Sequence, residues 1–351
     1  MDSISIEIAG RKIGVDHVPY VVAELSANHN GDLDCALGLI ELAKQSGADA
    51  VKIQTYRPDT ITIDCDKPEF QIRGGLWDGH SLYELYQKAH TPWDWHGELF
   101  AKARDVGITL FSSPFDHAAV DLLEELQAPA YKIASFEAID LPLIARVAAT
   151  GKPMIISTGM SSRQEIAEAI DCARDNGARE IAILHCVSGY PAPAQDYNLK
   201  TIPDMIEQFA VPVGISDHTP DNVTAIGAVV SGGCIVEKHL TLDRTRGGAD
   251  DSFSIEPDEL AQLCRDVKTA ALAVGKVHYG PVESDSSNIK FRRSLFVVND
   301  IEPGEVLTME NVRSIRPGNG LAPKHLPQVL GKQAACALPR GTALQWDFIE
   351  E

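Results

Sequence analysis

Two histidines stand at the ends of apolar, β-prone runs of the sequence. His218 comes just after "VPVGIS" (211–216), and His239 is the penultimate residue of "CIVEKHL" (234–240). If these runs are neighbouring strands, both imidazoles can face one point, as a divalent cation requires of nitrogen ligands. Two protein ligands leave positions open for water or a substrate oxygen, which favours a Lewis-acid site over a closed structural zinc site. A single histidine would more often be a hydrogen-bonded core residue.

Two lysines lie inside apolar runs, Lys52 in "AVKIQ" and Lys132 in "YKIA". An unpaired ammonium group would be costly there, so either an anionic ligand such as phosphate meets it or a glutamate pairs with it. Glu24 and Glu137 also follow apolar runs, and they are candidates for this pairing, for binding metal or a sugar hydroxyl, and for proton transfer. Both interpretations can hold, because a lysine can pair with a carboxylate until an anion arrives.

The other apolar runs also end in polar residues. A packed core would reject such groups, so their convergence at one end of the runs is the strongest indication of a functional site. Serines there could complete a phosphate site by hydrogen bonds, although serine at a strand end is more often a turn or helix cap. The further polar residues at these ends are Gln54, Ser112, Ser113, Ser135, Ser157, His185, Ser216, Glu237 and Lys238.

The elements that position these residues alternate between strand and helix. Eight short apolar runs are separated by segments of helical periodicity within roughly 260 residues, which is typical of a (β/α)8 TIM barrel. A doubly wound sheet is the alternative, but the first run is not followed by a glycine-rich dinucleotide-binding turn. The runs are "YVVAEL", "AVKIQT", "ITLFSS", "AYKIAS", "PMIIST", "IAILHC", "VPVGIS" and "CIVEKHL". In a barrel, their carboxyl ends meet at the face that carries the chemistry.

The chain is predicted to contain two domains. The barrel occupies 1–280, with a hairpin at its start (1–18) and an insertion near 56–96 that is too long for a plain βα loop. A polar, turn-rich linker (281–290) follows, and the pattern then changes to short strands and Gly/Pro turns over 291–351. We therefore expect a small, β-rich second domain.

Composition excludes several classes of function. The 351 residues include 31 Lys and Arg against 50 Asp and Glu, a net charge of -19 that argues against a nucleic-acid or anionic-membrane surface. Seven cysteines without a C-x-x-C pair suit a reducing compartment. Neither a secretory leader nor a membrane-length apolar run is evident in the sequence, so we expect a cytoplasmic protein.

Taken together, the motifs resemble those of the sialic acid (nonulosonic acid) synthase family. They are "AELSANHNGD", "GADAVKIQT", "SSPFD", "PAYKIAS", "GKPMIISTGM", "LHCVSGYPAP", "GISDHT", "EKHLTLD" and "RSLFVVNDIEPGE...RPGNG", in the expected order over nearly the whole chain. The resemblance implies a barrel followed by an antifreeze-like (SAF, β-clip) domain. It also implies a transferase that condenses phosphoenolpyruvate with an N-acylated amino sugar and releases phosphate.

The resemblance assigns a role to individual residues. Glu24 or Glu137 would position water or move a proton. Arg316 would reach the barrel of a partner subunit, which implies a domain-swapped homodimer. The implied phosphoenolpyruvate contacts are Lys52, Lys132, Ser135, Ser157, Ser188 and Ser216, with serine at 188 where some members have asparagine. The implied sugar contacts are Gln54, Tyr190, Asp250 and Arg316, with "RGGADD" around 250 where members often read P-G-P-D. The implied ligands of a divalent metal (manganese, magnesium or cobalt) are His218 and His239.

A finer resemblance concerns the acceptor sugar. "ELSANHNG" and "LYELYQKAHTPWDWH" are similar to the pseudaminic acid synthase branch, whose acceptor is 2,4-diacetamido-2,4,6-trideoxy-L-altrose. Trp77, Trp93 and Trp95 could form an aromatic cover for this weakly polar sugar, or they could simply pack within the insertion. The alternatives are an N-acetylneuraminate or legionaminate synthase, a metal-dependent pyruvate aldolase, and a non-catalytic sugar-binding protein.

Overall fold

The computed structural model describes residues 4–350 of the chain. These residues form two compact units, one ending at Gly275 and the other starting at Lys276. Each unit has a hydrophobic core of its own. Across the described range, no helix is both long and apolar enough to cross a membrane.

The first unit is built on a closed barrel of eight parallel strands. Each strand pairs with the next along the chain, and the last pairs with the first to close the ring. Strands buried on both faces read as near-continuous apolar runs, which is why the sequence pattern located them. The predicted (β/α)8 barrel is confirmed, and the doubly wound alternative is excluded. The strands are β3 (Tyr20–Glu24), β4 (Ala50–Thr55), β5 (Thr109–Pro114), β6 (Tyr131–Ile133), β7 (Met154–Ser157), β8 (Ile181–Cys186), β9 (Val213–Asp217) and β10 (Ile235–His239).

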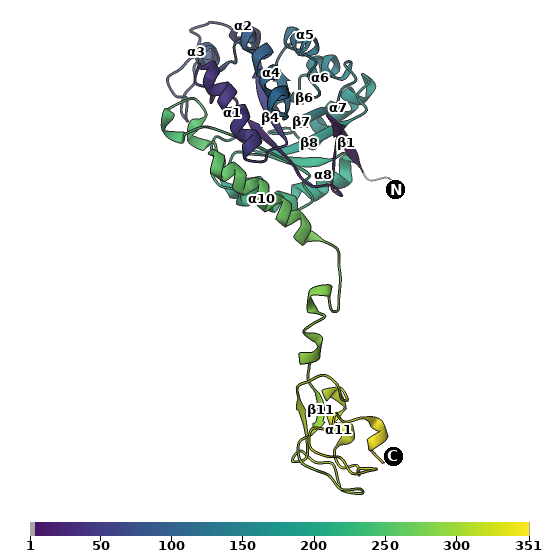
Figure 1. Ribbon diagram of the computed structural model, residues 1–351. Coiled ribbons are helices and arrows are strands. Elements are labelled where there is room, and N and C mark those ends of the chain that lie inside the picture. Colours follow the sequence, from purple (N-terminus) through teal and green to yellow (C-terminus); the bar gives the residue numbers. More distant parts are fainter. Residues whose placement is uncertain (1–3, 351) are drawn as a thin grey trace. The chain divides into compact units, whose positions relative to one another are not determined.

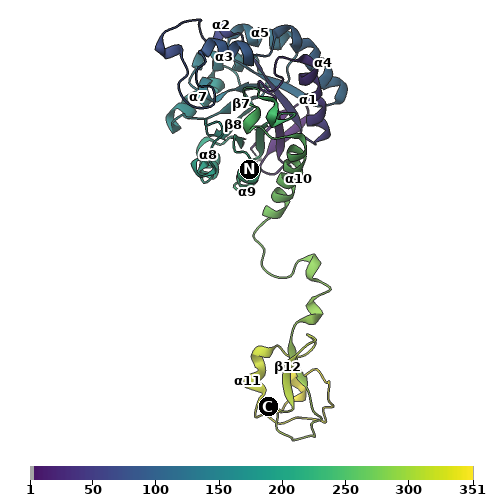
Figure 2. The same cartoon turned by 90° about the vertical axis from the view of Figure 1, so that its left-hand side faces the viewer.

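Helices follow the strands and surround the barrel (Figures 1 and 2). Their ends are set locally. The Asp32 side chain accepts hydrogen bonds from two backbone N–H groups at the start of α1, and Gly107 takes a left-handed conformation just after α4. The helices are α1 (Leu33–Gln45), α4 (His96–Val106), α5 (His117–Glu125), α6 (Leu141–Ala148), α7 (Arg163–Asp175), α8 (Thr201–Phe209), α9 (Val223–Val230) and α10 (Pro257–Val274).

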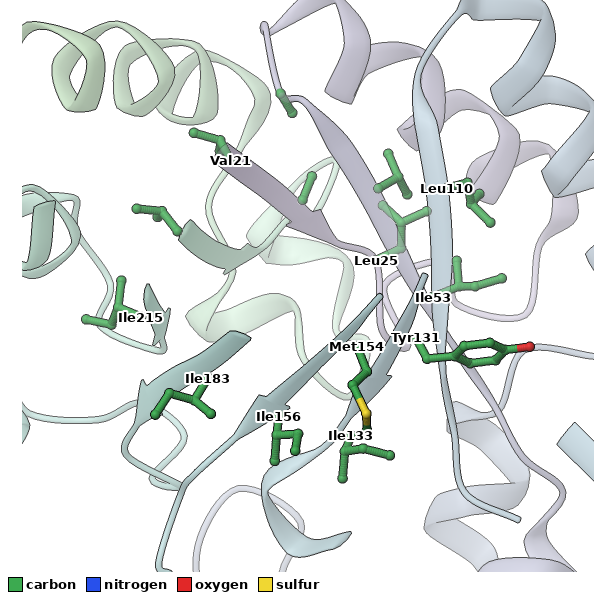
Figure 3. Packing of buried hydrophobic residues seen from close by; sticks show 14 of the residues in the cluster. Val21, Leu25, Ile53, Leu110, Tyr131, Ile133, Met154, Ile156, Ile183 and Ile215 are labelled. Atoms are coloured by element: carbon green, nitrogen blue, oxygen red, sulfur yellow. The ribbon is translucent and has the colours of Figure 1, made fainter. Parts of the chain in front are cut away.

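An apolar layer joins the strands to the helices. Val21, Ile53 and Ile183, which Figure 3 shows on three different strands, belong to one buried cluster with helix residues such as Leu39 and Ile144. Because successive residues of a strand point to opposite faces, the strand residues next to these three face the barrel interior.

A second apolar cluster fills the N-terminal end of the barrel interior. Strands β1 (Ser5–Ile8) and β2 (Arg11–Gly14) form a hairpin whose Ile8 and Ile13 pack with inward-facing strand residues such as Phe111. The hairpin therefore closes this end of the barrel. The polar residues are left to the opposite end.

The segment 56–96, between β4 and α4, is folded. It contains α2 (Pro58–Ile61) and α3 (Leu82–Ala89), which pack on each other, and the short 3-10 turns η1 (Pro68–Phe70) and η2 (Trp93–Trp95). Ser81 begins α3 with a reciprocal cap, because its side chain accepts from the Glu84 N–H and its own N–H donates to the Glu84 carboxylate.

The second unit is small and rich in β-structure. Its strands β11 (Ser294–Val297) and β12 (Val312–Ile315) are antiparallel, and a one-turn helix, α11 (Leu326–Val329), lies later in the chain. Isolated β-bridges add further pairing, and Leu295, Leu307 and Leu344 belong to its core. Residues 276–293, which precede β11, are exposed. The small β-rich domain that the sequence predicts is confirmed.

Candidate active site

A cavity of about 510 Å³ lies at the C-terminal ends of the barrel strands. Most residues predicted for the site line it: Lys52, Gln54, Lys132, Ser135, Glu137, Ser157, Tyr190, Ser216, His218, His239 and Asp250. Glu24 and Ser188 do not line it but contact residues that do. Arg316 is exposed and follows β12 in the second unit. The structure therefore brings the predicted barrel residues together, and Arg316 keeps only its sequence-based assignment.

Four charged side chains form a buried cluster, of which Lys52, Lys132 and Glu237 line the cavity and Glu24 lies behind Lys52. Lys52 Nζ lies 2.8 Å from Glu24 Oε2 and 3.5 Å from Glu237 Oε1, and Lys132 Nζ lies 3.2 Å from that same Glu237 oxygen. All four residues are at most 3% exposed. Both lysines thus pair with barrel glutamates, which is one of the two interpretations that the sequence left open.

Glu237 carries the larger share of this pairing. Its Oε1 is approached by both lysines and accepts a 3.0 Å hydrogen bond from Ser216 Oγ, whereas its Oε2 has no partner among residues 4–350. Burial would raise the pKa of Glu237, but Lys132 and Lys52 outweigh burial and lower it to about 2. Burial lowers the pKa of Lys132, although Glu237 opposes that shift. The sequence placed Glu237 at a strand end, but no role was predicted for it.

Serines lie beside the charged cluster. Ser135 Oγ and Ser188 Oγ are 3.0 Å apart, and the buried Ser157 Oγ has no hydrogen-bond partner in the described part of the chain. Gly159 has a positive φ of 48°, and a Cβ on it would lie 2.5 Å from the Cβ of Ser135. A larger residue would displace Ser135, so glycine keeps the paired hydroxyls in place. Hydroxyls near two ammonium groups are suited to an anion such as phosphate.

The two histidines lie together, with ring centroids 5.4 Å apart. His218 Nδ1 is 2.8 Å from the Val187 carbonyl, which can only accept, so the ring proton is on Nδ1 and the lone pair is on Nε2, which lies 3.5 Å from Ser216 Oγ. Burial lowers the pKa of His218 to about 4, and burial together with His218 lowers the pKa of His239 well below its usual value. Both rings are therefore neutral at pH 7.

Two neutral imidazoles fit a divalent cation. The buried His239 Nδ1 has no hydrogen-bond partner within the described residues, which leaves that nitrogen without a structural task. Over the same residues, no three His, Cys, Asp or Glu side chains gather closely enough to hold a metal between them.

A hydrogen-bonded chain connects three segments at the rim of the cavity. Gln54 Nε2 donates to Glu24 Oε1 and to Ser26 Oγ, at 3.0 Å each, and Ser26 in turn donates to Asp250. Burial raises the pKa of Asp250, and the hydrogen bond from Ser26 opposes that shift. The loop "RGGADD" is thus fixed to the first strands although its sequence departs from the family pattern. Ser26 was not predicted, because it lies one residue beyond the apolar run "YVVAEL".

Glu137 differs from the other carboxylates of the cavity. It lies in the 3-10 turn η3 (Ser135–Glu137), and the structure shows no partner for its Oε2 among residues 4–350. Burial raises the pKa of Glu137 to about 7. A carboxyl group that titrates near neutral pH can both accept and return a proton, which is the property required of a general acid–base catalyst.

An apolar wall, which comes from the insertion except for Phe115, lines part of the cavity. Four residues of α3 at helical spacing (Leu82, Leu85, Tyr86 and Ala89) line it, together with Ile61, Ile72, Trp77 and Phe115. We call these eight residues the apolar wall. Trp77 is held by a 2.9 Å hydrogen bond from Nε1 to the Ala249 carbonyl. Trp93 instead donates to the Tyr56 carbonyl, and Trp95 packs on His29. Of the three tryptophans, Trp77 alone lines the cavity within the described chain.

Comparison with known proteins identifies the family. A family model described as the NeuB family matches residues 39–279, and one described as the SAF domain matches residues 292–350. The chain belongs to the NeuB family. The predicted resemblance to nonulosonic acid synthases, the transferase class and the antifreeze-like domain are thereby confirmed.

Relatives of this NeuB chain extend over almost all of it. It is 42% identical over 334 residues to the pseudaminic acid synthase of Helicobacter pylori, covering 95% of this chain and 98% of that protein. It is 38% identical over 318 residues to the N,N'-diacetyllegionaminic acid synthase of Campylobacter jejuni, covering 90% and 95%. Among solved structures, the N-acetylneuraminic acid (sialic acid) synthetase of Leptospira borgpetersenii matches with a TM-score of 0.73 and 30% identity, over 83% of this chain and 96% of that one.

Proposed function

We propose that this NeuB-family chain is a pseudaminic acid synthase. It condenses phosphoenolpyruvate with 2,4-diacetamido-2,4,6-trideoxy-L-altrose and water, and it gives pseudaminic acid and phosphate. The observation that carries this proposal is a cavity that combines a buried lysine–glutamate cluster, two neutral imidazoles and an apolar wall. The 42% identity to pseudaminic acid synthases, against 38% to a legionaminic acid synthase, supports the choice of acceptor.

The two ends of the acceptor have different chemistry, and so do the two sides of the cavity. The open-chain sugar reacts at its C1 aldehyde, which must lie beside the charged cluster. Its C6 methyl group lies at the far end of the carbon chain, and the apolar wall that also lines the cavity is suited to receive it. A 6-hydroxyl group placed there would lose its hydration without gaining a partner from Leu82 or Leu85, which disfavours 6-hydroxy acceptors.

In the reaction, the methylene carbon of phosphoenolpyruvate forms a bond to the aldehyde carbon of the sugar. Water adds to the carbon that bears the phosphate, and the C–O bond to phosphate then breaks. Lys52 and Lys132 hold the anion throughout, and Ser135, Ser157 and Ser216 donate hydrogen bonds to it. Glu137, with its near-neutral pKa, takes up a proton from the attacking water and delivers it to the former aldehyde oxygen, which becomes a hydroxyl group; the second proton of the water leaves with phosphate as the ketone forms.

His218 and His239 would hold the divalent metal. NeuB-family synthases are generally metal-dependent, and a cation bound there would polarise the aldehyde oxygen of the acceptor. We expect chelation to abolish turnover and manganese, magnesium or cobalt to restore it, because two protein ligands permit easy exchange. His218→Ala and His239→Ala should each remove the response to added metal. Full turnover in metal-free buffer would refute the metal assignment.

Phosphate release from phosphoenolpyruvate, measured with three acceptors, tests the function. The acceptors are the precursors of pseudaminic, legionaminic and N-acetylneuraminic acids, and we expect the highest kcat/KM with the first. Leu85→Ala should raise KM for that acceptor about tenfold, since the apolar contact of one side chain is lost. The matched control is Leu272→Ala, because Leu272 is 83% exposed. Preference for another acceptor would move the assignment to that branch, and use of free pyruvate would indicate an aldolase.

The small domain carries a separate proposal that rests on the sequence resemblance. Arg316 would contact the acceptor in the barrel of a partner subunit, so the active form would be a homodimer with exchanged domains. Arg316→Ala and Lys132→Met are expected to be nearly inactive separately. Mixed under conditions of subunit exchange, they should recover activity, because one site of the heterodimer would carry neither defect. No recovery despite exchange would mean that the small domain serves its own barrel.

A further inference from the structure

A third buried lysine lies outside the cavity. Lys238 stands on β10 between Glu237 and His239, which both line the cavity. Val236, two residues earlier, belongs to the apolar layer between barrel and helices, so by strand alternation Lys238 points into that layer as well. It is 1% exposed. Its ammonium group is thus buried on the side of the strand away from the substrate.

All three N–H bonds of this ammonium group are used. Lys238 Nζ lies 2.7 Å from Asp217 Oδ2, 2.7 Å from the Thr219 carbonyl and 2.6 Å from the Asp221 carbonyl. Asp217 is the last residue of β9 and is the direct partner of Lys238 in the register of the two strands. The lysine therefore joins β10 to three residues at the end of β9 and in the loop beyond it.

The same loop is tied to itself around the ammonium group. Asp217 Oδ1 accepts from the Thr219 N–H at 2.9 Å, and Thr219 Oγ1 donates to the Asp221 carbonyl at 3.1 Å. His218 is the residue between Asp217 and Thr219. Both of its neighbours in the chain are therefore held by Lys238, which itself stands next to His239.

Other contacts of His218 lead elsewhere. Its backbone N–H donates to the Tyr197 hydroxyl at 2.7 Å, and its ring binds the Val187 carbonyl. These bonds orient the imidazole relative to the chain after β8. The backbone pairing of β9 with β10 and the Ser216–Glu237 hydrogen bond join this segment to the strand of His239, and the Lys238–Asp217 pair adds a side-chain tie at the residues next to the two histidines.

We propose that the Lys238–Asp217 pair is a positioning device for the metal site, which fixes the backbone of His218 relative to that of His239. The inference rests on the proposed metal-binding role of the two histidines. In a site with two protein ligands, metal affinity depends on how well those ligands are held at the correct separation before the metal arrives. Neither residue of the pair lines the cavity.

The test replaces the pair with apolar residues and measures Mn²⁺ binding. In Lys238→Met/Asp217→Leu both charges are absent, so no unpaired charge remains buried and the barrel is expected to fold. The loop carbonyls lose their donor, and we expect the dissociation constant for Mn²⁺, measured by electron paramagnetic resonance titration, to rise about 10- to 100-fold. Turnover lost at low Mn²⁺ should return at high Mn²⁺, which would not occur if the damage were general.

Two further variants keep the inference falsifiable. If the double variant does not fold, Asp217→Asn replaces it. This variant preserves the shape of the side chain and a hydrogen-bonding oxygen, so it should show a smaller loss of Mn²⁺ affinity than we expect of the double variant. The control is Lys152→Met/Glu124→Leu. It removes a partly exposed ion pair, with Nζ 2.7 Å from Oε1, whose residues do not line the cavity, and it should leave Mn²⁺ affinity unchanged. Unchanged affinity in the Lys238 and Asp217 variants would overturn this inference alone. Absence of Mn²⁺ binding in the unaltered protein would overturn the metal assignment as well.

Discussion

Two groups of buried lysine and carboxylate side chains lie on opposite faces of β10. They differ in how many of their polar atoms have a hydrogen-bond partner. Inside the barrel, Lys52 and Lys132 share a single oxygen of Glu237. In the helix layer, Lys238 directs each of its three N–H bonds to an oxygen of Asp217 or of the adjoining loop.

This difference in hydrogen bonding distinguishes a binding site from an ion pair that only stabilises the fold. A buried polar group without a partner destabilises the fold, and it is retained where a ligand supplies the missing contact. Glu237 Oε2, Ser157 Oγ and Glu137 Oε2 have no hydrogen-bond partner in the described residues, and all three residues line the cavity. The Lys238 group offers a ligand nothing further. Burial alone would not have distinguished the two.

The largest expected effect is on stability. Lys238→Met leaves the Asp217 carboxylate buried without its counter-charge, which should lower the free energy of unfolding by about 3–5 kcal/mol. Chemical denaturation measures this directly, and the protein that still folds should retain its KM for phosphoenolpyruvate. Adding Asp217→Leu should restore part of the lost stability. If the single variant is as stable as the unaltered protein, the two groups do not differ in the way described.

The next effect is on catalysis. Lys132→Met removes one charge-assisted contact to the anion, so kcat/KM for phosphoenolpyruvate should fall roughly 100-fold. The KM for the sugar should change much less. The free energy of unfolding should change little, because Lys52 continues to pair with Glu237. Equal damage to both substrates, accompanied by a large loss of stability, would make Lys132 a structural residue like Lys238.

The smallest effect concerns pH. Because the pKa of Glu137 is raised to about 7 in the folded protein, the unfolded chain releases this proton at lower pH than the folded chain does. The contribution of Glu137 to stability is therefore present in acid and is lost as pH rises toward about 7. Glu137→Gln should lose less thermal stability than the unaltered protein between about pH 5 and pH 8. Exposed Glu283→Gln is the control, and superimposable profiles for Glu137→Gln and the unaltered protein would contradict the assignment.

Much of the barrel was predictable because parallel strands buried on both faces must be written in apolar residues. "PMIIST" and "IAILHC" are such runs. The lysines and histidines that interrupt or end other runs, such as Lys52 in "AVKIQT", were recognisable as anomalies. The choice of carboxylate was not predictable in this way. Glu24 and Glu137 were the candidates, and Glu24 does pair with Lys52, yet Lys132 pairs with Glu237, because the pairing depends on which side chains meet across the barrel. Alternation along β10 was the available signal, since it places Glu237 on the face of His239.

The insertion was the least predictable part. Its tryptophans carry no periodicity that distinguishes a cavity-lining residue from a packed one, and the outcome depended on tertiary contacts. Trp77 was directed to the cavity by the Ala249 carbonyl, whereas Trp93 was held by the Tyr56 carbonyl. Leu82, Leu85 and Ala89 form a stripe on α3, but the sequence predicted only an insertion here, and nothing in it indicated that this stripe faces a cavity.

The β1–β2 hairpin has a kinetic consequence. Because Ile8 and Ile13 close the N-terminal end of the barrel, ligands enter and leave the cavity at the C-terminal ends of the strands. Lys132 is 2% exposed, whereas Leu82, Leu85 and Ala89 of α3 are partly exposed. If the proposed function holds, we expect phosphoenolpyruvate to bind before the sugar and phosphate to leave after the nonulosonic acid. In a cavity with one opening, the ligand that binds first is expected to leave last.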